Sequence, residues 1–384
     1  MKKHYLMTPG PTQVPEATLL AQARPIVHHR SPAYTELLLE TLDGLKYVFQ
    51  TKRDIMLFAS SGTGAMESAV ANLFSPGDRV LVASTGNFGE RWIKICKAYN
   101  LDVVALEYEW GQRLNPSDIE AKLQADTSIK GVFITHAETS TGVVNEVKKV
   151  AEITSRSSAV LIVDAVSGLG ACELKMDDWG IDVVVSGSQK ALMTPPGLAF
   201  AAVSERAWEL VEKSTSPRFY FDYRAYKKAL DKPSPQNPYT PAICTIMALG
   251  ESLRLIKEEG IENVWERHRI LAKATREGVK ALGLKLFSPD DEMCNAVTAV
   301  NAPEGIDGGA IVKSVREKHG VWLAGGQGKL KGKIFRIGHC GFYLPSDIIV
   351  TLASLERSLL ELGYKLEAGA GLIAAQKVFV EAGV

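Results

Sequence analysis

Short apolar runs alternate with longer amphipathic stretches through the middle of this 384-residue chain. Seven of these runs have the length of strands: 54–59, 79–83, 102–106, 131–135, 160–164, 183–186 and 198–203. Helical patterns lie between most of them, at 65–73, 90–99, 116–123 and 148–155. The alternation predicts an α/β fold in which a mostly parallel seven-stranded sheet lies between helices. Ligands bind such sheets beyond the carboxyl ends of the strands.

The sequence changes character near residue 233, where closely spaced prolines predict an extended connector. These prolines are Pro233, Pro235, Pro238 and Pro241. A long helical run follows at 243–259, and Gly260 is a plausible end for it. The remainder predicts a smaller α+β unit with helices at 264–282 and 347–362, strands at 296–300 and 334–337, and an alanine-rich last helix after Gly363. We therefore expect an N-terminal arm at 1–19, a large domain at 20–259 and a small C-terminal domain at 260–384.

Charge and cysteine content argue against several classes of function. Lys+Arg and Asp+Glu both total 44, so the formal net charge is zero and gives no reason to expect nucleic acid or an anionic membrane as a partner. The five cysteines are scattered without a CxxC pair, which disfavours a thiolate metal site and a disulfide framework. The sequence shows neither a signal-peptide run nor a segment long enough to span a bilayer. We expect a cytoplasmic protein with no metal and no membrane partner.

Two charged residues follow neighbouring strands at the edge where a ligand is expected. Lys190 comes just after the run 183–186, and Asp164 ends the run 160–164. This pair is what a pyridoxal phosphate (PLP) site requires. The lysine forms a Schiff base with the cofactor and moves a proton, and the aspartate keeps the pyridine nitrogen protonated. Each residue alone is more often a surface charge or a helix cap, so the assignment depends on further contacts.

Candidates for those contacts lie at three other strand ends. The stretch Ser60-Ser61-Gly62-Thr63-Gly64 joins a strand to a helix, and its small residues favour either a phosphate cup or a tight, well-capped turn. Phe88 follows the next strand and either stacks on a flat cofactor ring or belongs to the core. The hydroxyl-rich stretch 138–142 either bonds a phenolic oxygen or caps a helix.

Together these residues resemble the class V aminotransferases of PLP fold type I, nearest to the alanine–glyoxylate and serine–pyruvate aminotransferase group. The resemblance covers nearly the whole chain. It is carried by Thr8-Pro9-Gly10-Pro11-Thr12, Ser61-Gly62-Thr63-Gly64 with Glu67, 135–142, Asp164-Ala165-Val166-Ser167, Gly187-Ser188-Gln189-Lys190-Ala191 with Pro195-Pro196-Gly197, and Phe335-Arg336-Ile337-Gly338.

The resemblance implies a role for each matching position. Lys190 and Asp164 would be the catalytic pair. The other cofactor contacts would be Ser61, Gly62, Thr63 and Gln189 at the phosphate, Val166 and Phe88 on the two ring faces, and Thr139 at the phenolic oxygen. In a homodimer with shared active sites, Asn237 and Thr240 would reach the phosphate of the neighbouring subunit. Substrate would be bound by Arg336, which holds the carboxylate as a bidentate fork, and by Gly10 and Arg30.

The implied reaction is a ping-pong transamination, through a Schiff base on Lys190, between alanine or serine and glyoxylate or pyruvate. Arg30 leaves a second possibility open, because His28-His29-Arg30-Ser31 resembles an element that phosphoserine aminotransferases use on the substrate phosphate. Arg30 would then select a dianionic donor, phosphoserine or aspartate, or it would only support the dimer interface. Two less favoured alternatives are a cysteine desulfurase that uses Cys340 and a non-catalytic partner subunit.

Overall fold

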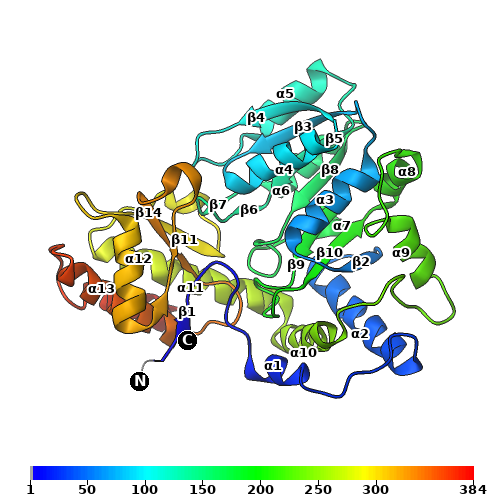
Figure 1. Ribbon diagram of the computed structural model, residues 1–384. Helices are drawn as coiled ribbons and strands as arrows, with labels where there is room; N and C mark the ends of the chain where they lie inside the picture. The colour runs from blue at the N-terminus through cyan, green and yellow to red at the C-terminus, as the bar shows by residue number, and fades with distance from the viewer. Residues whose placement is uncertain (1–2) are drawn as a thin grey trace.

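The computed structural model describes residues 3–384, and its central feature is a seven-stranded sheet (Figure 1). The strand order is β2-β10-β9-β8-β5-β3-β4. Strand β10 runs antiparallel to both of its neighbours, and the other pairs are parallel. The bounds are β2 (Ile55–Ala59), β3 (Arg79–Ser84), β4 (Asp102–Glu107), β5 (Gly131–Thr135), β8 (Val160–Asp164), β9 (Val183–Gly187) and β10 (Leu198–Val203). The prediction of a mostly parallel seven-stranded sheet is confirmed.

Helices cover both faces of this sheet because successive strand residues point to opposite sides. In β8, Leu161 and Val163 pack in one core cluster, whereas Val160 and Ile162 pack in the other. The first cluster is completed by α2 (Pro32–Phe49), α5 (Pro116–Ala125), α6 (Val147–Thr154), α7 (Met176–Trp179) and α10 (Ile243–Glu259). The second is completed by α3 (Gly62–Leu73), α4 (Asn87–Ala98), α8 (Glu205–Lys213) and α9 (Tyr223–Leu230). Both sheet faces are therefore buried.

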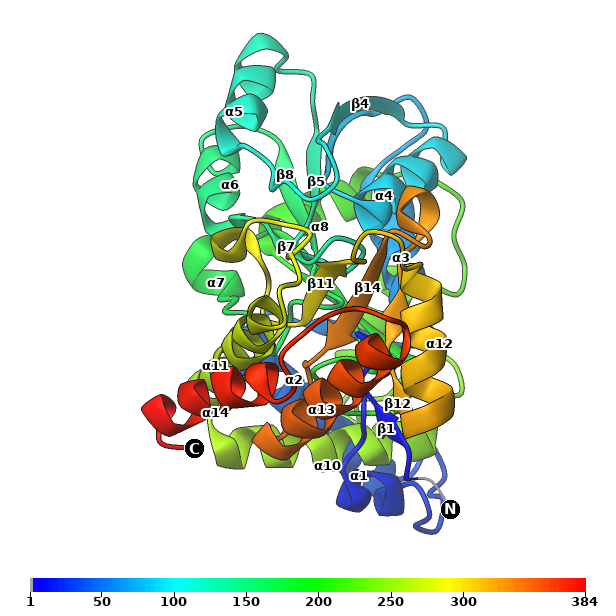
Figure 2. The same cartoon turned by 90° about the vertical axis from the view of Figure 1, so that its left-hand side faces the viewer.

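The C-terminal part has its own core, beside which the N-terminal segment lies (Figure 2). Its helices are α11 (Ile261–Ala281), α12 (Gly308–His319), α13 (Pro345–Glu361) and α14 (Ala370–Ala382), with 3-10 turns at Asp290–Glu292 and Gly328–Leu330. A three-stranded sheet joins β11 (Val297–Asn301), β14 (Ile334–Gly338) and β13 (Ala324–Gly325). Strand β1 (Tyr5–Leu6), which precedes α1 (Glu16–Ala21), pairs in parallel with β12 (Val321–Trp322). The predicted domain boundary at 259/260 stays a prediction; α10 and α11 meet there at Gly260, whose φ is +86°.

The helix starts predicted near two of the strand ends are wrong. Helices α3 and α4 each begin three residues before the predicted start, because residues assigned to turns form their first helical turns. The stretch 138–142, expected either to bond a phenolic oxygen or to cap a helix, supplies caps to α4, because Ser140 Oγ and Glu138 Oε2 accept the N–H groups of its first turn. It is the tip of a hairpin between β6 (Ala137–Glu138) and β7 (Val143–Val144), whose strands are too short to show a periodic pattern.

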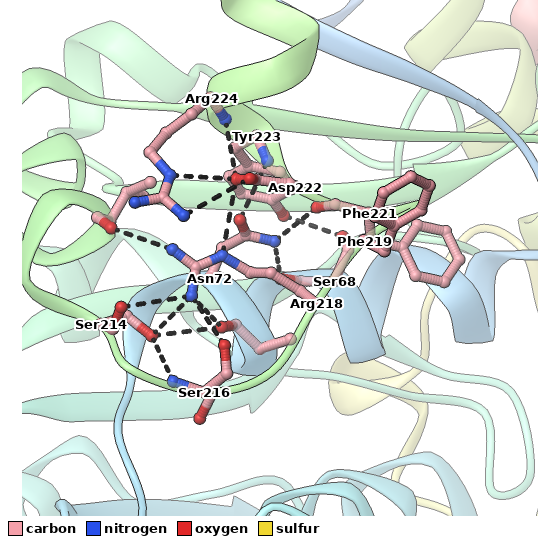
Figure 3. Close-up of polar contacts among 12 residues, drawn as sticks. Ser68, Asn72, Ser214, Ser216, Arg218, Phe219, Phe221, Asp222, Tyr223 and Arg224 are labelled. Atoms are coloured by element: carbon pink, nitrogen blue, oxygen red, sulfur yellow. Dashed lines mark hydrogen bonds and ion pairs between the residues drawn. The ribbon is translucent and has the colours of Figure 1, made fainter. Parts of the chain in front are cut away.

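Helix α3 is fixed by the loop that connects α8 to α9 (Figure 3). The Asn72 side chain donates to the carbonyls of Ser68 and Phe221 at 2.8 and 2.6 Å, and it accepts the N–H of Tyr223 at 2.9 Å. From the same loop, Arg218 donates to the carbonyl of Ala71 at 3.3 Å. These bonds hold the helix whose first turn lies at the carboxyl end of β2. Among residues 3–384, no helix combines the length and the apolar character that a bilayer span needs.

Candidate active site

Lys190 and Asp164 lie at the carboxyl edge of the central sheet, on two hydrogen-bonded strands. In the register of β8 and β9, Asp164 is opposite Val185, and Lys190 follows the end of β9 by three residues. Asp164 is 3% exposed and Lys190 is 9% exposed. Burial lowers the pKa of Lys190, so its amine gives up a proton more readily than a surface lysine does. Burial also raises the pKa of Asp164 to about 6, against the N–H of Val166, which donates to Oδ1 at 2.9 Å.

The N-terminal motif closes over Lys190. The Lys190 ammonium donates to the carbonyl of Pro9 at 2.6 Å, and the Thr12 hydroxyl donates to the carbonyl of Lys190 at 3.0 Å. Gly10 has a φ of +136°, and a Cβ there would collide with the Lys190 side chain. Glycine is therefore required at position 10 for steric reasons, and the segment excludes solvent from the lysine.

The first turn of α3 forms a cradle against the other strand ends. Ser61 is the N-cap but makes no side-chain cap bond, which leaves its hydroxyl for another partner. A Cβ on Gly62 would lie 2.6 Å from Val166 Cγ2, and one on Gly187 would lie 3.3 Å from the Gly62 nitrogen. Among the described residues, the buried Gln189 Oε1 has no hydrogen-bond partner. Unpaired N–H groups at a helix start, with small residues around them, suit a phosphate.

Phe88 and Arg91 extend this cradle from the first turns of α4. The Arg91 guanidinium lies 4.6 Å from the centroid of the Phe88 ring and donates to Thr63 Oγ1 at 2.8 Å. Its charge acts on both Asp164 and Lys190 and favours the ionised carboxylate. Arg91 was not predicted from the sequence as a site residue. The available signal was its position one helical turn after Phe88, which places both side chains on one helix face.

Arg336 on β14 approaches the site from the C-terminal part of the chain. It is 4% exposed and donates to the carbonyl of Gly325 at 3.0 and 2.8 Å, and to the carbonyl of Thr139 at 2.7 Å. Burial lowers the pKa of Arg336 to about 10, and the charge of Glu138 opposes that change. The guanidinium is therefore cationic at neutral pH. Backbone carbonyls orient it, so its charge is not cancelled by a direct ion pair.

Three predicted site residues have no hydrogen bond to Lys190, Asp164 or Arg336 within residues 3–384. Asn237 accepts the Tyr34 hydroxyl proton and donates to the carbonyl of Leu57 at 3.1 Å. Arg30 donates to the carbonyls of Asn237 and Pro238 at 2.7 and 3.1 Å, and to Gln236 Oε1 at 2.5 Å. Thr240 is exposed on the same connector. These contacts tie the connector to its own chain.

Comparisons with known proteins agree with this arrangement. The family model for class V aminotransferases matches residues 4–331. The chain is 45% identical to the soluble hydrogenase 42 kDa subunit of Anabaena cylindrica, over 98% of this chain and 99% of that protein. It is 40% identical to a serine–glyoxylate aminotransferase of Arabidopsis thaliana, over 97% of this chain and 94% of that enzyme. A crystal structure of ureidoglycine–glyoxylate aminotransferase from Bacillus subtilis superposes with a TM-score of 0.94 at 34% identity, covering 99% and 98% of the two chains. The chain belongs to the class V aminotransferase family and is a PLP-dependent enzyme of fold type I.

Proposed function

We propose that this enzyme transfers the amino group of a small donor, alanine or serine, to glyoxylate or pyruvate. The proposal rests on the different surroundings of two arginines. Arg336 is buried beside the strand ends and suits one carboxylate, whereas Arg30 is bound by three acceptors of the connector. Because these acceptors already bind Arg30, it is not the expected partner of a second anionic group on the substrate. The Arabidopsis and Bacillus relatives are both named as glyoxylate aminotransferases, which supports glyoxylate as an acceptor for this enzyme.

The buried residues divide the chemical work. PLP, when bound, supplies a ring that withdraws electrons from the substrate α-carbon. In the proposed roles, the first turn of α3 and Gln189 hold its phosphate, and Val166 and Phe88 enclose its ring. Asp164, as a carboxylate, would pair with the pyridine nitrogen. Lys190 Nζ, whose pKa is lowered by burial, takes the α-proton and returns it.

Arg336 fixes the donor by its carboxylate and so orients the α-carbon toward Lys190. The segment around Gly10 and Pro9, which covers Lys190, excludes water from this proton transfer. Each side chain thus binds, orients or moves a proton, and none needs a metal ion.

We also propose a cytoplasmic homodimer with shared active sites. Asn237 and Thr240 lie on a connector where Asn237 bonds Tyr34 and Leu57 and Thr240 is exposed, which fits a role of the connector in the site of a second copy. Large apolar side chains are exposed at Phe219 (79%) and Ile26 (67%), as expected of surfaces that a partner covers. Sedimentation should give a dimer that loses PLP affinity on dilution. A fully active monomer would overturn this assignment. The five free cysteines fit a reducing compartment.

A panel of donors and acceptors tests the proposed reaction. Purified protein with PLP should transaminate serine or alanine with glyoxylate or pyruvate faster than phosphoserine or aspartate. Arg336→Ala should weaken every donor, because all of them carry the α-carboxylate. Faster turnover of phosphoserine or aspartate would overturn the assignment of a small donor.

The Anabaena relative, named as a hydrogenase subunit, favours one second candidate, a non-catalytic subunit of a larger assembly. The intact set of Lys190, Asp164 and Arg336 supports catalysis instead, because a purely structural role needs none of the three. Turnover with no donor in the panel would favour the subunit.

A further inference from the structure

Glu138 is a buried carboxylate in the β6–β7 hairpin that has no place in the roles given above. It is 0% exposed. Its Oε2 accepts the N–H groups of Phe88 and Gly89 at 3.0 and 3.1 Å. Its Oε1 accepts the N–H of Ser140 at 3.2 Å and the Ser140 hydroxyl at 2.5 Å. Burying a carboxylate costs free energy unless it is hydrogen-bonded, and four donors, three of them backbone N–H groups, bond Glu138.

The first two of these bonds replace a missing helix cap. Helix α4 begins after Gly86, which has no side chain to accept the free N–H groups of the first turn. Ser140 Oγ accepts the N–H of Asn87 at 3.0 Å, and Glu138 takes the next two. A Cβ on Gly86 would lie 2.5 Å from Glu138 Cγ, so the close approach depends on glycine. The hairpin tip therefore sets the position of the Phe88 backbone.

Glu138 is also connected to Arg336, the arginine proposed to bind the substrate carboxylate. Glu138 holds Ser140, and the intervening Thr139 carbonyl accepts a hydrogen bond from Arg336 Nη1 at 2.7 Å. The Glu138 charge is also close enough to act on Arg336, whose pKa it raises against the effect of burial. One carboxylate thus lies between Phe88 on α4 and Arg336 on β14, two elements from distant parts of the chain.

We propose that Glu138 is a positioning residue that holds Phe88 and the Thr139 peptide at a fixed separation, and so aligns the cofactor ring with the substrate carboxylate. This role rests on the proposed function, because it concerns the spacing between the two groups that transamination brings together. It places no reacting atom on Glu138 itself.

Two substitutions distinguish the contacts that Glu138 makes with α4 from those that it makes with Ser140. In Glu138→Gln, the amide oxygen is expected to face α4, where it satisfies two N–H groups, and the amide nitrogen to face Ser140. The Ser140 N–H then loses its acceptor and the Thr139 carbonyl shifts. PLP affinity of the apoenzyme should stay within about twofold, while the dissociation constant of propanoate, a carboxylate without an amino group, should rise on the order of tenfold. Glu138→Ala should weaken both PLP and propanoate. Both constants are read from cofactor absorbance, without turnover.

Asp182→Asn is the matched control, because Asp182 is also a buried carboxylate bound by a backbone N–H and a serine hydroxyl, at the amino end of β9. It should lower the melting temperature and leave propanoate binding unchanged. If Glu138→Ala does not fold, Ser140→Ala removes the acceptor of the Asn87 N–H and should give a smaller rise for propanoate. Changes in Glu138→Gln no larger than in Asp182→Asn would overturn the proposal. If the wild type transaminates no donor, the proposed function fails, but these titrations still test Glu138.

Discussion

Two buried aspartates at opposite ends of neighbouring strands differ in how completely their carboxylates are bonded. Asp182, at the amino end of β9, accepts the N–H of Leu161 and the Ser204 hydroxyl, each at 2.9 Å, and lies 3.6 Å from Arg206 Nη1. Asp164, at the carboxyl end of β8, accepts one hydrogen bond within residues 3–384, from Val166. They are 4% and 3% exposed. At equal burial, the fully bonded carboxylate serves the fold, and the incompletely bonded one is available to a ligand.

The same difference separates the two edges of the sheet. The carboxyl edge gathers buried Lys190, Arg336 and Glu138 with raised or lowered pKa values, and Gln189 Oε1 is left without a partner there among the described residues. Burial raises the pKa of Asp182 as well, but there the carboxylate accepts two hydrogen bonds within the protein and lies near a guanidinium group. Substitutions that compare the two edges should therefore separate effects on turnover from effects on stability.

The largest effect is expected for Lys190→Ala at the carboxyl edge. Loss of the amine removes the group that carries the α-proton, and turnover should fall on the order of ten-thousandfold or more. In the wild type, borohydride reduction should attach PLP to Lys190, as peptide mapping would show. The matched control is Lys175→Ala, which removes a surface lysine paired with Glu173 at 2.9 Å and should keep both turnover and labelling. A label on another lysine would contradict the assignment.

Asp164→Asn should slow turnover by orders of magnitude and yet stabilise the apoenzyme. The native pKa of Asp164 is about 6, above the ordinary value of 3.8, so the wild type loses stability as the pH rises from about 4 through 6. The asparagine variant avoids this loss, which amounts to at most roughly 3 kcal/mol for a shift of about two units. Urea unfolding of both apoenzymes at pH 5 and pH 7.5 should show a difference that grows with pH. An equal or lower stability of the variant at pH 7.5 would refute the comparison.

Asp182→Asn should differ from Asp164→Asn in both turnover and stability. Burial raises the pKa of Asp182 as well, but two hydrogen bonds and the charge of Arg206 stabilise its carboxylate. The amide cannot serve all the donors that the carboxylate accepts and loses its attraction to Arg206, so unfolding free energy should fall by about 1 kcal/mol. Turnover per folded molecule should stay at the wild-type level. A loss of turnover without a loss of stability would show that the amino edge has a catalytic role.

Much of this arrangement could be predicted from chain order. The seven strands were predicted to within one residue, because a strand buried on both faces is a continuous run of apolar residues in the sequence. The proximity of Lys190 and Asp164 was predicted as well, because each residue lies at or just after the end of one of two neighbouring strands. The pairing of β1 with β12 was missed, because strands of two residues show no period and the partners are over 300 positions apart.

Parts of the site depend on contacts that no local pattern contains. Glu138 is one acidic residue in a polar loop, and only the fold shows that it caps α4. The stretch around it was open between a phenolic-oxygen contact and a helix cap. It is a hairpin tip whose Ser140 hydroxyl caps α4, and the contact of Thr139 with a phenolic oxygen stays a prediction. The roles of Asn237, Thr240 and Arg30 depend on a second chain, so they stay predictions.

The smallest effect is expected for Arg30→Ala, which tests the donor assignment. Its three hydrogen bonds hold residues 236–238, so the variant should loosen the connector and weaken all donors together by a few-fold, in proportion to dimer lost. If Arg30 instead bound a side-chain anion, KM would rise on the order of a hundredfold for phosphoserine or aspartate and stay unchanged for alanine, because truncating one partner of a buried charge pair costs several kcal/mol. Kinetics with the four donors, alongside sedimentation of each variant, distinguish the two patterns. Arg336→Ala, which should weaken every donor strongly without changing the dimer, shows that the assay detects the loss of a carboxylate contact.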